Sequence, residues 1–331
     1  MQKTEGKAGG LAALRKISAN SNATALFILL FIIVFGAVLS FLSPNFLTAY
    51  NIGIIIKQMS FVGMAALGQT LVLITIGTDL SVGTTANLAG ILFAIFAASN
   101  GMNPIVAIVL VLIISMLIGL VSGLLITRLR LSSFIVTLGV SEICYGAVLV
   151  LTQGETITGI KGAVLQIGKG MLGPVPVPTI IFIAFAFLLT YVMKYTPFGR
   201  MLYAIGGNKN AARLAGIRVE RTTCAVFALS ALLSALGGIM ITCRYGSGQP
   251  GIGETWRMTS ITASVVGGTS MAGGAGRPLG TVIGALLISL LSNAIVILNI
   301  SQYWEKVVTG GVVLVAVVID ALRNRTMIRS K

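Results

Sequence analysis

The sequence predicts an all-α polytopic membrane protein with about ten transmembrane helices and both termini in the cytoplasm. Hydrophobic residues make up 56% of the 331 residues, whereas charged residues make up only 9%. A soluble domain carries about one charged residue in four, so this composition excludes a soluble globular fold. The apolar residues gather into runs near 20 residues long, about the length at which a helix crosses the bilayer core.

Five apolar runs fill the first half of the chain, and a long external segment over 152–177, rich in Gly and Pro, separates them from the sixth. The seventh to tenth runs follow a polar segment in the middle of the chain. The eighth is the weakest, because it is short and rich in Gly, Ser and Thr. In order, the ten predicted spans cover residues 24–42, 53–76, 83–99, 104–126, 134–151, 178–194, 222–243, 258–272, 279–298 and 304–321.

The basic residues set the orientation, since cytoplasmic loops of membrane proteins carry an excess of Lys and Arg. With the N-terminus inside, most basic residues of the chain fall in cytoplasmic segments. The sequence therefore divides into a cytoplasmic tail (1–22), a transmembrane domain (23–322) and a basic cytoplasmic tail (323–331). The net charge of +15 does not indicate nucleic-acid binding, because no basic stripe interleaved with aromatic residues occurs.

Catalytic and cofactor motifs are absent from the sequence. The chain has no His, and its three Cys lie in apolar spans without metal-ligand spacing, so we expect neither a metal site nor an enzyme. The stretch GAVLQIGKG (162–170) is the nearest approach to a nucleotide loop, but its spacing is wrong and it falls on the external side. We therefore expect this chain to bind no ATP and no cofactor of its own.

Polar residues inside the predicted spans are mostly uncharged. Amides and hydroxyls there can line a route for a neutral, hydroxyl-rich solute, but they also hold helices together. Glu142 is the deepest carboxylate in a span, and intramembrane charges are costly and often functional. The candidate pathway residues are Gln58, Gln69, Thr70, Asn87, Glu142 and Asn293.

Helix packing or gating is the expected role of a second set of residues. Gly276, Gly280 and Gly284 recur at the four-residue spacing that lets helix backbones approach closely in lipid. Asp79 lies between two spans, where its carboxylate is expected to cap the following helix, with a gating role as the alternative. The stretches around Asp79 and Gly276 resemble each other, so an internal duplication is an open interpretation.

A polar segment from Lys194 to Arg221 interrupts the apolar sequence and carries six basic residues and one acidic residue. Its composition alone is that of an ordinary inner loop. Its sequence, GRMLYAIGGNKNAARLAGIRV, resembles the cytoplasmic segment of sugar-type ABC transporter permeases of the ribose, xylose and galactose branch. Three further stretches match the family in the same order: GTDLSVG (77–83), GGTSMAGGAGRPLGTVIGALL (267–287) and SQYWEKVVTGGVVLVAVVIDALRNR (301–325).

The resemblance implies a permease subunit of an importer in the inner membrane. Two permeases, identical or paralogous, would form the pore. A soluble binding protein would deliver a monosaccharide, such as a ribose-like pentose, and a cytoplasmic ATPase would use ATP and Mg²⁺. An ion-coupled secondary transporter is the alternative. The resemblance places the ATPase-coupling segment at 195–221, with a tight bend at the glycine pair, and its residues as Gly199, Arg200, Tyr203, Gly206, Gly207, Asn208, Ala211, Ala212, Arg213 and Gly216.

The sequence also departs from the family pattern. Many relatives carry two acidic residues ahead of the GGTS stretch, where this chain has Arg257 and Thr259. The usual GIDLS is GTDLS here. These changes leave the solute open among pentoses, hexoses, furanoses of the autoinducer type and sugar alcohols.

Overall fold

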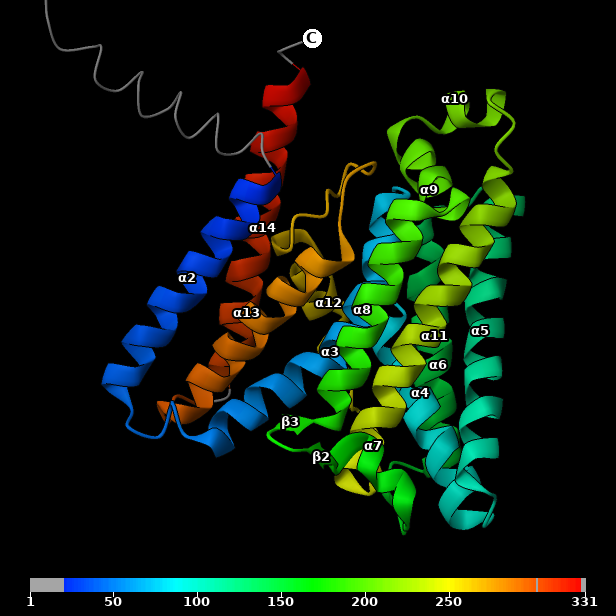
Figure 1. The fold of residues 1–331 in the computed structure, drawn as a ribbon. Coiled ribbons are helices and arrows are strands. Elements are labelled where there is room, and N and C mark those ends of the chain that lie inside the picture. The colour runs from blue at the N-terminus through cyan, green and yellow to red at the C-terminus, as the bar shows by residue number, and fades with distance from the viewer. Residues whose placement is uncertain (1–20, 302, 329–331) are drawn as a thin grey trace, which may run out of the picture.

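The computed structural model describes residues 21–301 and 303–328, and these residues form a predominantly helical molecule (Figure 1). Its all-α, polytopic character agrees with the sequence prediction. The long helices are α2 (Ser21–Leu42), α3 (Ala49–Ile74), α4 (Val82–Ala94), α5 (Pro104–Arg128), α6 (Ser133–Thr152), α8 (Val177–Tyr195), α11 (Val219–Tyr245), α13 (Pro278–Ile297) and α14 (Tyr303–Ile328). The short helices α9 (Pro197–Gly207), α10 (Lys209–Leu214) and α12 (Trp256–Val266) lie between them.

Within the described residues, seven helices are long and apolar enough to cross a bilayer. They are α3, α4 with its π-helical continuation η1 (Ile95–Ser99), α5, α6, α8, α11 and α13. Helix α2 carries a shorter apolar stretch, Ile28–Leu42. The predicted tail over 1–22 lies almost wholly outside the described residues, and α14 continues without a break beyond the expected boundary at 322.

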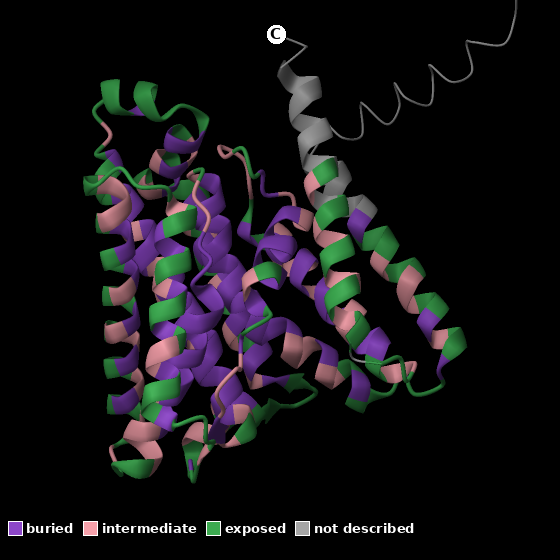
Figure 2. Ribbon diagram, turned by 180° about the vertical axis from the view of Figure 1, so that it is seen from behind, coloured by how far each residue is buried: buried purple, intermediate pink, exposed green. Residues whose placement is uncertain are grey.

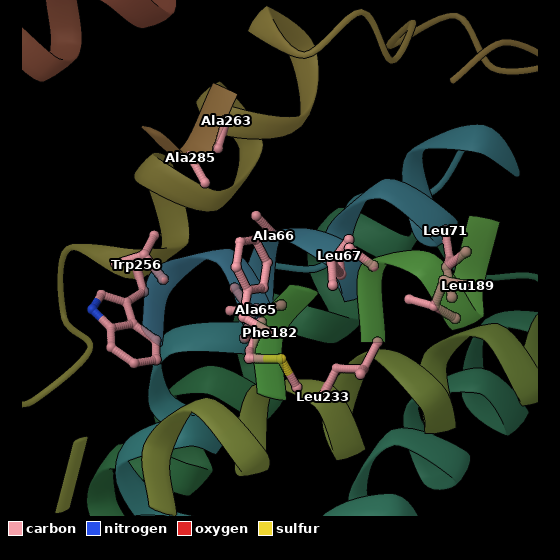
Figure 3. Packing of buried hydrophobic residues seen from close by; sticks show 14 of the residues in the cluster. Ala65, Ala66, Leu67, Leu71, Phe182, Leu189, Leu233, Trp256, Ala263 and Ala285 are labelled. Carbon is pink, nitrogen blue, oxygen red and sulfur yellow. The ribbon is translucent and has the colours of Figure 1, made fainter. Parts of the chain in front are cut away.

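Helices α3 and α11 form the centre of the molecule. Helix α11 packs on α3, α4 and α5, and α3 also packs on α12 and α13. Figure 3 shows side chains of α3 packed beside Phe182 of α8, Leu233 of α11 and Trp256 of α12. Buried residues fill this interior, whereas exposed residues follow the outer faces of the peripheral helices (Figure 2). The apolar exposed faces suit contact with lipid, so the buried centre provides the scaffold that positions the polar sites.

Small residues allow this close packing. A Cβ added to Gly68 of α3 would lie 2.8 Å from the Cα of Ser230 on α11. A Cβ on Gly238 of α11 would lie 1.9 Å from the carbonyl oxygen of Ala86 on α4. Without much hydrophobic drive between helices in lipid, such close backbone contacts supply the van der Waals attraction that holds the bundle.

The predicted eighth span differs from a continuous helix. Helix α12 covers only Trp256–Val266 and then gives way to a loop over 267–277, because Gly267 and Gly268 end it, the latter with φ of +94°. Eleven residues make a helix about 16 Å long, roughly half of the hydrocarbon thickness. The non-helical stretch over 246–255 precedes α12 and packs against α4, where a Cβ on Gly83 would meet the Gly253 carbonyl oxygen at 2.1 Å.

The segment over 152–177, which was expected to be external, folds into short elements. They are β1 (Ile157–Thr158), η2 (Ala163–Leu165), α7 (Gln166–Lys169), β2 (Met171–Leu172) and β3 (Val175–Pro176). Strand β1 pairs antiparallel with β4 (Ser247–Gly248), and β2 pairs antiparallel with β3. The β1–β4 pairing fastens the external segment to the start of the stretch that leads into α12.

The two stretches that resemble each other in sequence meet in the fold. Each consists of a helix, a polar turn that contains glycine and a second helix: α3, residues 75–81 and α4 in one, and α12, residues 267–277 and α13 in the other. The backbone N–H of Gly274 donates a hydrogen bond to the carbonyl oxygen of Ile74 at 2.9 Å. The end of α3 and the α12–α13 loop therefore form one joined structure.

Candidate functional site

The polar central segment folds into two short helices, α9 and α10, which lie at the same end of the molecule as the start of α2 and the end of α14 (Figure 1). Thr196 precedes α9 and Pro197 occupies its first turn, a position where a missing N–H costs nothing. Asn208 begins α10, and its side-chain oxygen accepts hydrogen bonds from the backbone N–H groups of Asn210 and Ala211, both at 3.0 Å. This cap separates the two helices and fixes the direction of α10.

Helix α9 is docked on the joined structure formed by α3 and the α12–α13 loop. Gly206 is buried, and a Cβ on it would lie 1.9 Å from the Ile74 carbonyl oxygen and 2.3 Å from the Gly274 nitrogen. Only glycine permits this approach of three backbones. The Tyr203 hydroxyl donates a hydrogen bond to the Gly276 carbonyl oxygen at 2.8 Å. Burial raises the pKa of Tyr203, so the phenol keeps the proton that it donates.

Helix α10 presents one apolar side chain outward. Leu214 is 91% exposed, although it is a large hydrophobic residue. Ala212 on the same helix is buried and belongs to a small cluster with Ile205 and Val219. Arg213 donates to the Glu220 carboxylate at 2.5 Å. The helix is therefore fixed to the body through Ala212 and Arg213, and Leu214 is free to contact another protein.

A second candidate site is a pocket of about 270 Å³ at the point where α12 begins. The start of α4, the middle of α6, the stretch over 251–254 and the first turn of α12 surround it. We call it the membrane pocket, and its lining residues are Gly83, Thr84, Asn87, Glu142, Tyr145, Gly251, Ile252, Gly253, Glu254 and Arg257. Pockets at broken membrane helices are typical positions for transported solutes.

Charged and amide side chains connect the elements that line the membrane pocket. Arg257 donates to the Ser141 hydroxyl at 2.8 Å, and its nearest distance to the Glu142 carboxylate is 4.0 Å. The Asn87 amide donates to the Gln249 carbonyl oxygen at 2.9 Å and accepts from the Gly251 N–H at 3.1 Å. Asn87 therefore fastens the non-helical stretch to α4 and gives the pocket its shape.

Comparison with known proteins identifies the family. A model described as "Branched-chain amino acid transport system / permease component" matches residues 51–317. The chain is 41% identical over 300 residues to the ribose import permease protein RbsC of Bacillus subtilis, which covers 90% of this chain and 92% of that protein. The chain belongs to the sugar-type ABC transporter permease family. As a permease it is a transport subunit rather than an enzyme.

Further relatives of the permease are named for ribose and for xylose. RbsC of Escherichia coli K12 is 39% identical over 298 residues, covering 88% of this chain and 92% of its own. The xylose transport system permease protein XylH of Haemophilus influenzae is 30% identical over 343 residues, covering 85% and 92%. No solved structure matches the chain. The alignments cover 85–90% of this chain and 92% of each of these relatives, so most of the permease is shared with them.

The coupling residues inferred from the resemblance divide into two groups in the permease. Gly199, Gly206 and Ala212 are buried, whereas Arg200, Gly207, Ala211 and Gly216 are exposed. Ala212 is not available on the outer surface of α10, because its side chain packs toward Ile205 and Val219. The expected bend at Gly206 and Gly207 lies one residue later, since α9 continues through Gly207 and the chain changes direction at Asn208. The sequence analysis did not single out Leu214, although an apolar residue within a polar segment could have indicated it.

The candidate pathway residues do not all lie at one site. Only Asn87 and Glu142 line the membrane pocket. The remaining four lie elsewhere. Thr70 forms hydrogen bonds with Ser264 at 3.1 Å and Thr281 at 2.6 Å, and Asn293 exchanges amide hydrogen bonds with Asn51 at 2.7 and 3.1 Å. Gln69 is fully buried without a partner among the described residues, and Gln58 is half-buried on α3. Sequence reasoning did not place Thr84, Tyr145, Glu254 or Arg257 at this site. Arg257 had a signal, because it departs from the family pattern.

Asp79 is buried in the loop over 75–81 and does not cap α4 as expected. One carboxylate oxygen accepts from the backbone N–H of Ser81 at 2.9 Å and from its hydroxyl at 2.6 Å. The other accepts from the Ser230 hydroxyl of α11 at 2.8 Å. Ser81 takes the capping position of α4 and makes no side-chain cap. The capping prediction is wrong because the loop turns inward, so Asp79 joins the loop to α11.

The three glycines before and within α13 lie against different neighbours. Gly276 lies in the loop over 267–277 with φ of +159°, near the limit of the left-handed region. A Cβ on Gly280 would lie 2.0 Å from the Gly267 carbonyl oxygen, and one on Gly284 would lie 1.9 Å from that of Ala263. Gly280 and Gly284 thus let α13 approach α12 closely, and Gly276 supplies the carbonyl that Tyr203 contacts.

Proposed function

We propose that this permease carries a neutral, ribose-like monosaccharide into the cytoplasm by alternating access, powered by ATP hydrolysis on a separate subunit. The names of the ribose import relatives, at 39–41% identity, support the class of solute. ATP and Mg²⁺ would be bound by the partner ATPase, and this chain would bind neither.

One observation carries the mechanism. Helix α9 touches both the end of α3 and the α12–α13 loop, through Gly206 and Tyr203. A movement of α9 and α10 therefore pushes directly on the loop that ends α12. The first turn of α12 lines the membrane pocket. ATP-driven closure of the partner subunit would reach the pocket through this short path.

A second permease subunit, identical or paralogous, would cover the exposed face of α6. Glu142 is 67% exposed, and a carboxylate in lipid costs about 2.5–3.5 kcal/mol on insertion scales. Gly139 and Gly146 lie one helical turn on either side of it, and a Cβ on either glycine would meet nothing within 4 Å. A partner helix fits such a face better than lipid does. The membrane pocket would then open toward the shared pore.

The other partners follow from the same assignment. An extracytoplasmic binding protein would deliver the sugar at the end of the molecule that carries β1, β4 and α7. The cytoplasmic ATPase would bind α10 at the opposite end, with Leu214 at the contact. The permease would lie in the inner membrane with both termini on the ATPase side.

The experiment reconstitutes the permease with its ATPase in liposomes, with loaded binding protein on one side and ATP on the other. We expect accumulation of labelled ribose that requires hydrolysable ATP and persists when ionophores collapse the proton and sodium gradients. Uptake by the permease alone, driven by an ion gradient, would indicate a secondary transporter and overturn the proposal.

A further inference from the structure

We propose that Arg257 and Glu142 together form the solute-recognition pair of the membrane pocket, and that its ligand is a neutral polyhydroxylated molecule whose neighbouring hydroxyl groups bridge the two side chains. The inference deepens the proposed function and rests on it. It assigns a binding role to Arg257 and a ligand chemistry to the pocket.

The pair is close but incompletely bonded. Its shortest N–O distance of 4.0 Å exceeds the 2.7–3.2 Å of a hydrogen bond. Arg257 is anchored at one nitrogen by the Ser141 hydroxyl, which also accepts from Thr84 at 3.2 Å. A guanidinium has five N–H donors and a carboxylate accepts at two oxygens. Arg257 therefore retains free N–H donors and Glu142 retains free acceptor oxygens, and both can bind the hydroxyl groups of a ligand.

The position of the pair argues for a functional role. Arg257 lies in the first turn of α12, a short helix packed on α3 and α13, and Glu142 lies in the middle of the apolar helix α6. Their side chains are 28% and 67% exposed, so they are not a sealed structural ion pair. Charges within membrane segments are expensive and usually face a cavity or pathway. Here both face the same pocket.

The balance of charge favours a neutral ligand. The pocket holds a second carboxylate, Glu254, which lies 3.5 Å from Lys306 at the start of α14. Two acids and one arginine in the lining repel an anionic solute more than they attract it. Each acid has a basic partner, so the site as a whole carries no excess charge for a cation either.

The lining also favours hydroxyl groups over an apolar side chain. Only Ile252 and the ring of Tyr145 are large apolar surfaces among the lining residues, and the others are charged, polar or glycine. A branched-chain amino acid would leave its aliphatic part against polar walls. A sugar hydroxyl, in contrast, can donate to Glu142 while its neighbour accepts from Arg257. The volume of about 270 Å³ lies just below the range of drug-sized sites, which suits one monosaccharide.

Neutral and charge-exchanged variants separate recognition from simple ion pairing. We compare Arg257→Gln, Glu142→Gln and the double exchange Arg257→Glu with Glu142→Arg, and use Glu155→Gln in the external loop as the matched control. Maximal ribose uptake is measured per assembled permease–ATPase complex. We expect each single variant to lose at least ten-fold, the exchanged pair to remain low, and the control to equal the wild type. Single variants within two-fold of wild type, or restoration by the exchange, would overturn the inference.

A second measurement does not depend on the folding of charge variants. Tyr145→Cys places a thiol in the pocket, while the three native Cys are buried. We expect millimolar ribose to slow maleimide labelling of this thiol at least three-fold and leucine to leave it unchanged. Protection by leucine but not by ribose would contradict the assigned chemistry. Failure of wild-type uptake with intact protection by ribose would count against the proposed transport cycle and not against the pocket.

Discussion

The Tyr203 hydroxyl donates a 2.8 Å hydrogen bond to the carbonyl oxygen of Gly276, which joins α9 to the loop between α12 and α13. Gly206, one turn further along α9, presses against Ile74 and Gly274. These contacts link the polar central segment to the end of α3 and to the α12–α13 loop. The α12–α13 loop directly follows α12, the short helix whose first turn lines the membrane pocket. The two candidate sites are therefore mechanically connected over a short distance.

Loss of the Tyr203 hydroxyl tests this connection. In Tyr203→Phe the ring remains, but the bond to Gly276 is lost, which costs about 0.5–1.5 kcal/mol for a typical hydrogen bond. We expect stimulation of the ATPase by loaded binding protein to fall several-fold, while the complex still assembles. Tyr191→Phe, on the exposed face of α8, is the control. Full stimulation in Tyr203→Phe would show that this bond does not transmit the movement.

A methyl group at Gly206 tests the close approach of the three backbones. Gly206→Ala would bring its Cβ to 1.9 Å from the Ile74 carbonyl oxygen, so α9 must move away from α3. We expect uptake to fall at least ten-fold and the melting temperature of the purified complex to drop. Gly53→Ala is the matched control, because its Cβ meets nothing within 4 Å on α3. Equal behaviour of the two variants would contradict the observed docking of α9.

An acidic residue at Leu214 tests the ATPase contact. Leu214→Asp removes the exposed apolar side chain of α10 without disturbing the buried Ala212. We expect co-purification of the ATPase with the permease to decrease at least five-fold, with insertion into the membrane unchanged. Leu172→Asp, at an exposed leucine of β2 at the opposite end of the molecule from α10, serves as control and should retain the ATPase. If both variants bind the ATPase equally well, α10 is not the contact.

Shortening Asp79 tests the link between the α3–α4 loop and α11. Asp79→Ala leaves the hydroxyls of Ser81 and Ser230 without their buried acceptor, and each unsatisfied group costs about 1–3 kcal/mol. Asp79→Asn keeps an oxygen and the shape of the side chain. We expect the melting temperature of the permease in detergent to fall in the order wild type, Asn, Ala. A melting temperature unchanged in Asp79→Ala would show that these bonds do not stabilise the loop.

The sequence predicted most of the architecture because apolar length and charge asymmetry report directly on membrane spans. The long helices α3, α5, α6, α8, α11 and α13 lie close to the expected ranges. Residues 244–257 were expected to lie between the seventh and eighth spans, but the local sequence does not specify how the stretch over 246–255 folds before α12. Its structure depends on contacts with α4, such as Asn87 with Gln249, which no local pattern contains.

The candidate sites could be predicted only in part, because their geometry also depends on residues that are far apart in the sequence. The central segment is recognisable from its own residues, but the inward direction of Ala212 depends on Ile205 and Val219 around it. Asn87 and Glu142 were expected to line a pathway as isolated polar residues in spans. Their common pocket required Arg257 from a distant helix. Polar residues such as Asn293 carry the same signal in sequence, yet that amide pairs with Asn51 and holds two helices together.

ATP dependence of uptake is the most direct test of the central claim. Liposomes containing the permease and its ATPase are supplied with ribose-loaded binding protein, and labelled ribose is followed with ionophores present. The account predicts accumulation that requires ATP hydrolysis, is insensitive to collapse of the ion gradients and is lost in Gly206→Ala. Ribose uptake that follows an imposed proton or sodium gradient without ATP would contradict it.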